Sequence, residues 1–131
     1  MNTNPENNTD TLVFQEIEID ESAKELAVLI SHDYYSEDSE FGKTLLASFL
    51  DTLISKASSG NLVLLINGCA VKLLSYGSIL AELIAVAGIV YICSDSLNAY
   101  NTDLNIEGNI VTLDSHAFFD EVLKYKPSVT I

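Results

Sequence analysis

The chain has 131 residues, 48% of them hydrophobic, which is enough for one domain with its own core and no metal or disulfide staples. Its 19 acidic residues stand against six lysines and no arginine, for a formal net charge of -13. A surface this negative repels polyanions, so nucleic acid is not an expected partner. No apolar run reaches the roughly 18 residues of a membrane-spanning helix, so we expect no membrane segment.

The first part of the chain is polar and acidic. Residues 1–10 are rich in Asn and Thr without apolar periodicity, which predicts a disordered tail. Residues 11–24 end in an alternation of Ile with acids, which predicts an acidic arm or an edge strand. We interpret the acidic residues as a solvated surface in preference to a docking surface for a basic partner. Nothing here is typical of a secretory leader, so we expect a cytoplasmic protein with free thiols.

From residue 25 onward, short apolar runs alternate with helical patterns. The runs are continuously apolar, as in strands buried on both faces, and lie at 26–31, 61–67, 88–93, 109–113 and 128–131. Apolar spacing predicts helices at 39–57, 76–87 and 117–125, the last capped by Asp114 or Ser115. Residues 25–131 are therefore predicted to form one α/β domain. Its open, mostly parallel sheet of about five strands carries helices on both faces, as in a flavodoxin-like three-layer sandwich.

The predicted helix at 78–87 is apolar nearly all round. Glu82 is its one charged residue. A helix of this kind is either buried within its domain or covered by another subunit, and a small domain rarely surrounds a helix completely. We therefore expect a homo-oligomer with this helix at or near the interface.

Candidate site residues follow from the sheet. In open parallel sheets, ligands bind beyond the carboxyl ends of the strands. The first strand is followed by polar side chains that include His32 and Asp33. The next two strands are followed by Asn67, Gly68 and Cys69 and by Cys93, Ser94, Asp95 and Ser96. Both cysteines therefore fall on the same rim.

Cys93 has two interpretations. It ends a strand just before a short helix expected near Ser96, where unpaired amide hydrogens stabilise a thiolate. Asp95 opposes this effect, because a carboxylate nearby raises the cost of a second negative charge. The alternative is that Cys93 simply packs at the end of the strand, since cysteine is among the most often buried residues.

The other candidates have a supporting role. His32 and Asp33 form either a base with its orienting group or an ordinary surface pair. Lys72 either lowers the pKa of a thiol near the Asn67 loop or caps a surface. The spacing of the two cysteines and two histidines fits no metal site, and no glycine-rich phosphate loop is present, so we expect neither metal nor cofactor.

Four segments carry a family pattern: LISHDYYSEDSEFGKTLLASFLDTL, LVLLINGCAVKLLSYGS, IVYICSDSLNAY and NIVTLDSHAFFDEVLKYKPSVTI. Their most specific points are Glu40 to Lys43, Asn67 with Val71 to Leu73, and Cys93 ahead of Leu97 and Tyr100. Together they resemble the DsrE/DsrF-like sulfurtransferase superfamily over residues 26–131. The resemblance is closest to the C-terminal domain of YedF-type proteins, which are linked with selenium metabolism.

The resemblance implies an open α/β fold of the DsrE type, usually oligomeric, in which some relatives carry sulfur as a persulfide on a cysteine. Cys93 matches the family cysteine after the third core strand. Close relatives read Cys-Gly-Thr-Cys where this chain reads Cys-Ser-Asp-Ser, so Ser96 replaces the second thiol and a dithiol cycle within the motif is excluded. Cys69 does not match a family position.

Two hypotheses follow. In the first, the chain is a sulfur-relay protein in which Cys93 accepts sulfane sulfur from a donor protein and passes it to an acceptor. Helix-end amides and Lys72 would stabilise the thiolate, and Cys69 would act as a resolving thiol if the two sulfurs approach disulfide distance. In the second, the chain is a non-catalytic oligomeric binding or assembly module that kept the fold and lost the chemistry. Asp95 and the missing second thiol favour the second hypothesis, and the retained Cys93 favours the first.

Overall fold

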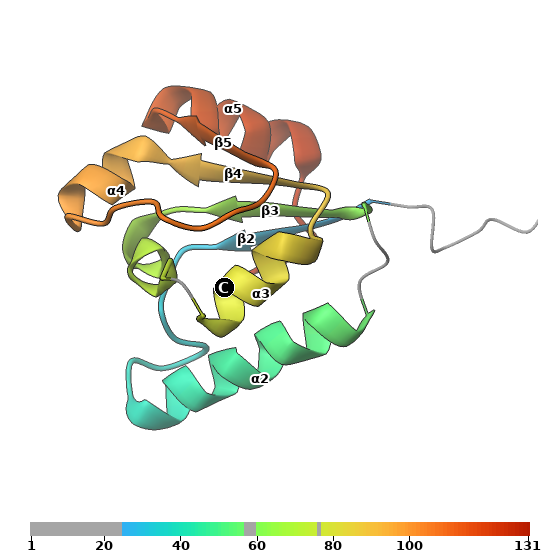
Figure 1. Ribbon diagram of the computed structural model, residues 1–131, viewed down its shortest axis with the longest axis vertical. Coiled ribbons are helices and arrows are strands. Elements are labelled where there is room, and N and C mark those ends of the chain that lie inside the picture. The colour runs from blue at the N-terminus through green and yellow to red at the C-terminus, as the bar shows by residue number, and fades with distance from the viewer. Residues whose placement is uncertain (1–24, 57–59, 76) are drawn as a thin grey trace, which may run out of the picture.

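The computed structural model describes residues 25–56, 60–75 and 77–131, so the tail and the acidic arm predicted for residues 1–24 lie outside the described residues. The described strands form one sheet in the order β5-β4-β3-β2-β6 (Figure 1). Each pair of neighbouring strands is parallel, which confirms the predicted sheet. The strands are β2 (Leu26–Ile30), β3 (Leu62–Ile66), β4 (Ile89–Cys93), β5 (Ile110–Leu113) and β6 (Val129–Thr130).

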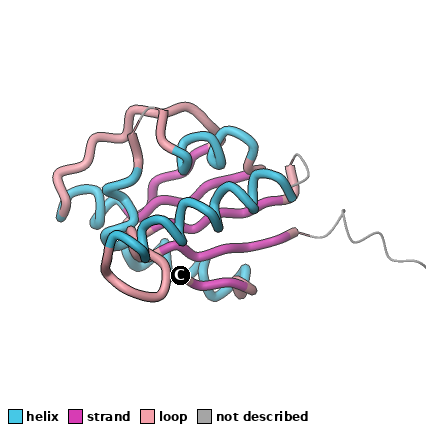
Figure 2. Tube along the Cα trace, turned by 90° about the horizontal axis from the view of Figure 1, so that it is seen from below, coloured by secondary structure: helices cyan, strands magenta, loops and turns pink. Residues whose placement is uncertain are grey.

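Helices cover both faces of the sheet. The helices α2 (Glu40–Lys56) and α3 (Ile79–Val86) lie on one face together with the 3-10 helix η2 (Gly68–Leu73). The helix α5 (Ser115–Tyr125) covers the other face, and α4 (Ser94–Ala99) follows the end of β4 (Figures 1 and 2). The predicted three-layer α/β sandwich is therefore confirmed.

The helix starts follow from local capping. The Ser78 hydroxyl accepts a hydrogen bond from the Ala81 amide at the start of α3, and the Asp114 carboxylate accepts one from the Ala117 amide at the start of α5. Asp114 is thus the cap of the last helix, and Ser115 is its first residue. The short helix expected near Ser96 begins earlier, at Ser94.

The helix η2 lies in a segment for which the sequence predicts a loop. It starts at Gly68, whose φ of 60° lies in the left-handed region. A Cβ at this position would come within 2.6 Å of the Ser31 carbonyl oxygen. Glycine therefore lets the chain turn tightly against the end of β2, and this close approach leaves no periodic signal in the sequence.

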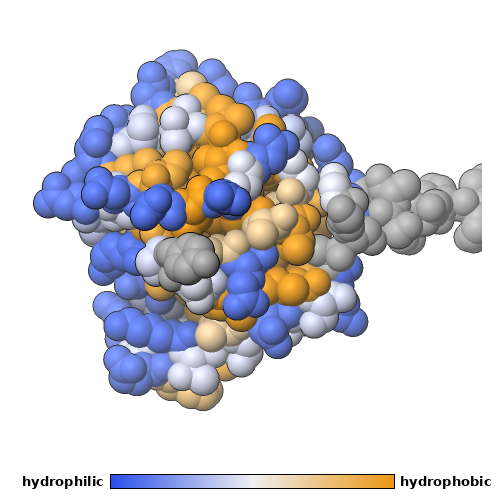
Figure 3. Space-filling view, viewed as in Figure 1, coloured by the Kyte–Doolittle hydropathy of each residue, from blue (hydrophilic) through white to orange (hydrophobic). Residues whose placement is uncertain are grey.

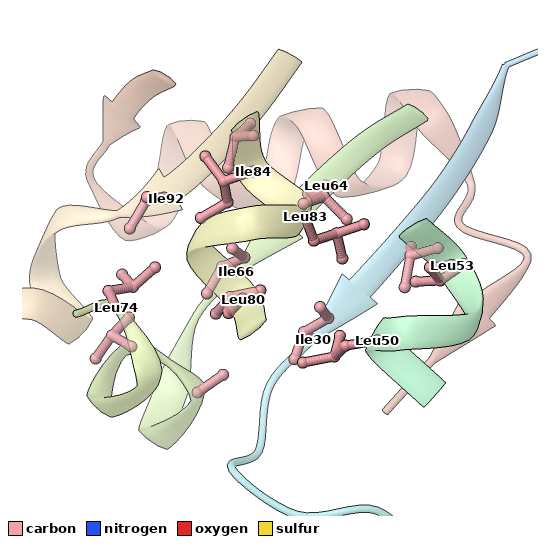
Figure 4. Packing of buried hydrophobic residues seen from close by; sticks show 14 of the residues in the cluster. Ile30, Leu50, Leu53, Leu64, Ile66, Leu74, Leu80, Leu83, Ile84 and Ile92 are labelled. Atoms are coloured by element: carbon pink, nitrogen blue, oxygen red, sulfur yellow. The ribbon is translucent and has the colours of Figure 1, made fainter. Parts of the chain in front are cut away.

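The core has two parts because alternate residues of each strand face opposite sides of the sheet. The larger part packs α2, α3 and η2 against the sheet, with Leu50 beside Ile30 and Leu80 beside Ile66 (Figure 4). The smaller part lies beneath α5 and consists of Ala27, Val63, Leu65, Tyr91, Cys93 and Phe118. The side chain of Cys93 therefore lies on the α5 face of the sheet.

The apolar helix α3 is buried on one side only. Leu80, Leu83 and Ile84 are fully buried against the sheet, whereas Glu82 and Val86 are exposed. On this face of the molecule, apolar surface gathers around the middle with hydrophilic surface at the rim (Figure 3). The domain itself thus covers the larger side chains of the helix, and the homo-oligomer stays a prediction.

The smaller part of the core gives a stability test. Phe118 is fully buried and the adjacent Phe119 is 49% exposed. We expect Phe118→Ala to lower the free energy of unfolding by about 3–5 kcal/mol, because it leaves a cavity beneath α5. Phe119→Ala, the matched control, should change it by less than about 1 kcal/mol. Urea unfolding measures both, and equal losses would contradict the burial of Phe118.

Candidate functional site

Cys93 ends β4 and is the N-cap residue of α4. The residue is only 3% exposed. Its sulfur lies 3.6 Å from the hydroxyl oxygen of Ser115, which begins α5. The thiol is therefore enclosed between the first turns of two helices, at the carboxyl end of the sheet.

Asp95 ties these two helices together. Its Oδ2 accepts one hydrogen bond from the Ser115 amide at 2.9 Å and another from the Ser115 hydroxyl at 2.7 Å. These two bonds lower the pKa of the Asp95 carboxyl below its usual value. The carboxylate is directed at Ser115, so it orients a hydroxyl that contacts the sulfur.

Ser96 is a further residue that affects the thiol of Cys93. The Gly68 amide donates a hydrogen bond to the Ser96 hydroxyl oxygen at 2.8 Å. Because this bond uses the oxygen as an acceptor, the hydroxyl proton of Ser96 stays available for the sulfur of Cys93. The hydroxyl of Ser96 can therefore help to stabilise the thiolate of Cys93.

These contacts determine the direction in which the pKa of Cys93 moves. Burial raises the pKa of the thiol, but hydrogen bonds from the hydroxyls of Ser96 and Ser115 and from the amides of Ser96 and Asp95 outweigh this effect. The net result is a pKa below the ordinary value. Asp95, expected from the sequence to repel a thiolate, contributes its amide to the stabilisation of that thiolate.

A second cluster surrounds Cys69. Its sulfur lies 3.5 Å from Oδ1 of Asp33 and 3.8 Å from the Ser31 carbonyl oxygen. Lys72 lies 3.3 Å from Oδ2 of the same Asp33. Burial raises the pKa of the Asp33 carboxyl, but the hydrogen bonds from Lys72 and Cys69 bring it below its usual value. Lys72 is therefore the ion-pair partner of Asp33. The charge of Lys72, which the sequence predicted to stabilise a thiolate, is directed at the cluster around Cys69.

The remaining candidate site residues either connect neighbouring strand ends or lie apart from the two thiols. The Ser31 hydroxyl donates to Oδ1 of Asn67 at 2.6 Å, which joins the ends of β2 and β3. His32 is exposed and its ring packs against Tyr34, with 4.9 Å between centroids. Asp33 faces Cys69 and Lys72, so the geometry does not assemble His32 and Asp33 as a base pair serving Cys93. Ser94 starts α4 and is half-buried.

The two cysteines are free thiols in separate surroundings. Cys93 lies beneath α5 in the smaller part of the core, and Cys69 lies in η2 beside Asp33. The resolving role of Cys69 stays a prediction. Among the described residues, no three His, Cys, Asp or Glu side chains are grouped in a way that could hold a metal ion.

Ser115 is the functional candidate that the sequence analysis missed. Its sequence position predicts only a helix cap. The rule that selected the other residues also applies to it, because Ser115 follows the carboxyl end of β5, the neighbour of β4. Extending the rule to the fourth strand would have identified it.

Comparisons with known proteins support the fold. No protein-family model and no curated protein matches the chain. A solved structure, described as a protein of unknown function, MTH1491, from Methanobacterium thermoautotrophicum, is similar with a TM-score of 0.55 at 18% sequence identity. The match covers 82% of this chain and 99% of that one. At this identity the likeness shows the α/β fold alone. No helix in the described part of the chain is long and apolar enough to span a membrane.

The role of Ser115 can be tested by titrating the thiol. In a Cys69→Ser background, we expect Ser115→Ala to raise the pKa of Cys93, because the thiolate loses a hydrogen-bond donor while its burial persists. The ultraviolet absorbance of the thiolate against pH, corrected with a Cys93→Ala variant, measures the midpoint. Ser94→Ala is the control and should leave the midpoint in place. An unchanged midpoint in Ser115→Ala would show that this hydroxyl does not stabilise the thiolate.

Proposed function

We propose that this chain is a sulfur-relay protein of the DsrE-like type that carries sulfane sulfur as a persulfide on Cys93. The observation that supports the proposal most is the place of the Cys93 sulfur at the start of α4, 3.6 Å from the Ser115 hydroxyl, where hydrogen bonds from Ser96, Ser115 and the Asp95 amide lower its pKa. The sequence resemblance to the DsrE/DsrF-like superfamily supports the same cysteine. A cytoplasmic location fits the proposal, because reduced thiols persist there.

The transfer would proceed in two displacements. The Cys93 thiolate attacks the outer sulfur of a donor persulfide, a new S–S bond forms, and the donor S–S bond breaks to release the donor thiolate. In the second step a thiolate of the acceptor attacks the outer sulfur and Cys93 leaves as a thiolate. Neither step changes the total oxidation state. A leaving thiol with a lowered pKa departs faster, so the donors around Cys93 would speed the second step.

One proton of Ser115 can serve both states of the thiol. When Cys93 is protonated, its S–H can donate to the Ser115 oxygen while the Ser115 hydroxyl donates to Asp95. When Cys93 is a thiolate, the Ser115 hydroxyl can turn to the sulfur. Asp95 then keeps the bond from the Ser115 amide. The carboxylate therefore retains a donor in either state.

The burial of Cys93 requires a movement before a protein donor can reach the sulfur. The helix α4 has six residues, none of them buried. Local opening costs least where few apolar contacts are lost, so α4 is the element that we expect to open. The movement would break the bonds of Asp95 with Ser115 and of Ser96 with Gly68. The Ser115 hydroxyl lies on α5, so it is the donor that would stay beside the sulfur when α4 opens.

The second candidate function is the non-catalytic oligomeric module. The 3% exposure of Cys93 and its packing with Phe118 favour it, because both are also expected of a strand-end core residue. In that case Asp95 and Ser115 would only fasten α4 to α5. An experiment that measures whether Cys93 takes up a sulfur atom distinguishes the two functions.

The sulfur-relay proposal predicts a mass change. The reduced protein is incubated with glutathione persulfide and its intact mass is measured. We expect a gain of one sulfur atom in the wild type and in Cys69→Ser, and no gain in Cys93→Ala. Ser115→Ala should load more slowly at neutral pH, since less of its Cys93 is thiolate. No gain in the wild type, or a gain that follows Cys69, would contradict the proposal and leave the non-catalytic module.

A further inference from the structure

A pocket lies away from Cys93, on the face of the sheet that carries α2, α3 and η2. Its volume is about 300 Å³, at the lower end of the range for small-molecule sites. The sulfur of Cys93 faces the opposite side of the sheet, beneath α5. The pocket is lined by Asp33, Lys43, Leu46, Ala47, Leu50, Lys72, Leu73 and Ile79.

The charge of the pocket differs from that of the rest of the protein. The chain has six lysines and a formal net charge of -13, yet two of the lysines, Lys43 and Lys72, line this one pocket. Lys72 is paired with Asp33 at 3.3 Å. Lys43 has a loose partner, Glu40, at 3.8 Å, with side chains 49% and 96% exposed, and such a pair contributes little. Lys43 is thus the lysine of the pocket whose ammonium group has only a loose, solvent-exposed partner.

The remaining lining is apolar. Leu46 and Leu50 lie one turn apart on α2 and form a buried floor, since each is almost fully covered. Leu73 of η2 and Ile79 of α3 supply half-buried apolar side chains from the other elements. A ligand that matches both the lysines and the apolar lining has an apolar body and one anionic group. The volume holds roughly ten water-sized groups, which limits the body to a few carbons.

We propose that this pocket binds a short aliphatic monocarboxylate of about four to eight carbons. Its carboxylate lies near the ammonium groups of Lys43 and Lys72, and its hydrocarbon chain lies on Ala47, Leu73 and Ile79, above the covered side chains of Leu46 and Leu50. Lysine suits a single carboxylate as a compact point charge, whereas the chain has no arginine for bidentate binding of phosphate. The site goes beyond the proposed sulfur relay and does not require it.

Hexanoate is the probe that tests the proposal. It is titrated into the full chain, and the amide NMR shifts of residues such as Ala47 and Leu73 are followed. We expect saturable shifts at the pocket, with affinity that rises roughly fourfold for each methylene from butanoate to hexanoate. Hexylamine and hexan-1-ol have the same tail without the negative charge, and both should bind more weakly. Equal binding of hexan-1-ol, or no shift with millimolar hexanoate, would overturn the proposal.

Two lysine variants on the same helix give the matched comparison. Lys43→Met should weaken hexanoate binding by roughly two- to fivefold, because it removes an exposed charge and leaves no buried group unpaired. Lys56→Met, in the last turn of α2 and outside the pocket, should bind as the wild type does. Cys93→Ala should also bind hexanoate normally, so the result does not depend on sulfur transfer. Unchanged affinity in Lys43→Met would reject the assignment of the carboxylate to this lysine.

Discussion

The candidate site depends on the register of the parallel strands. Ile30 of β2 lies opposite Ile66 of β3, and Ile66 lies opposite Ile92 of β4. The residues that follow this row therefore leave the sheet at the same edge. A slip by one residue in β4 would turn Cys93 from the α5 face to the opposite face and separate its sulfur from Ser115. Backbone pairing in the sheet thus controls the surroundings of the thiol.

Side-chain bonds then fasten the segments that the register brings together. Asn67 joins the ends of β2 and β3, Ser96 joins α4 to the start of η2, and Asp95 joins α4 to α5. Each of these residues is small or short, so the connecting segments approach closely. The thiol of Cys93 lies among these bonds and receives several of its donors from them. An acid two residues from a cysteine is therefore a structural link here and not simply a repelling charge.

Burial on both faces explains how much of the fold could be predicted from the sequence. A strand covered on two sides needs an unbroken apolar run, as LVLLI of β3 shows, and all five residues of this strand are buried. Unbroken runs predicted the sheet, and apolar spacing of three and four residues predicted the three longer helices. The helix η2 could not be predicted in this way, because it depends on the close approach of Gly68 to Ser31. The pairing of Lys72 with Asp33 joins η2 to the segment after β2, and no spacing within one segment encodes it.

The helix η2 lies between the two sites. The amide of its first residue, Gly68, donates a hydrogen bond to Ser96, which follows Cys93 in α4. Lys72 in its last turn lines the pocket between α2, α3 and η2, for which we propose a monocarboxylate ligand. Ala70 and Val71 in the middle of η2 are fully buried in the larger part of the core. A segment held by two buried residues resists displacement, because moving it would expose their side chains. A ligand that only pairs with the charge of Lys43 or Lys72 gains no binding energy from a displacement of η2. Filling the pocket should therefore leave the bond between Gly68 and Ser96 intact, and the pocket and the thiol should act independently even though one short helix contributes to both.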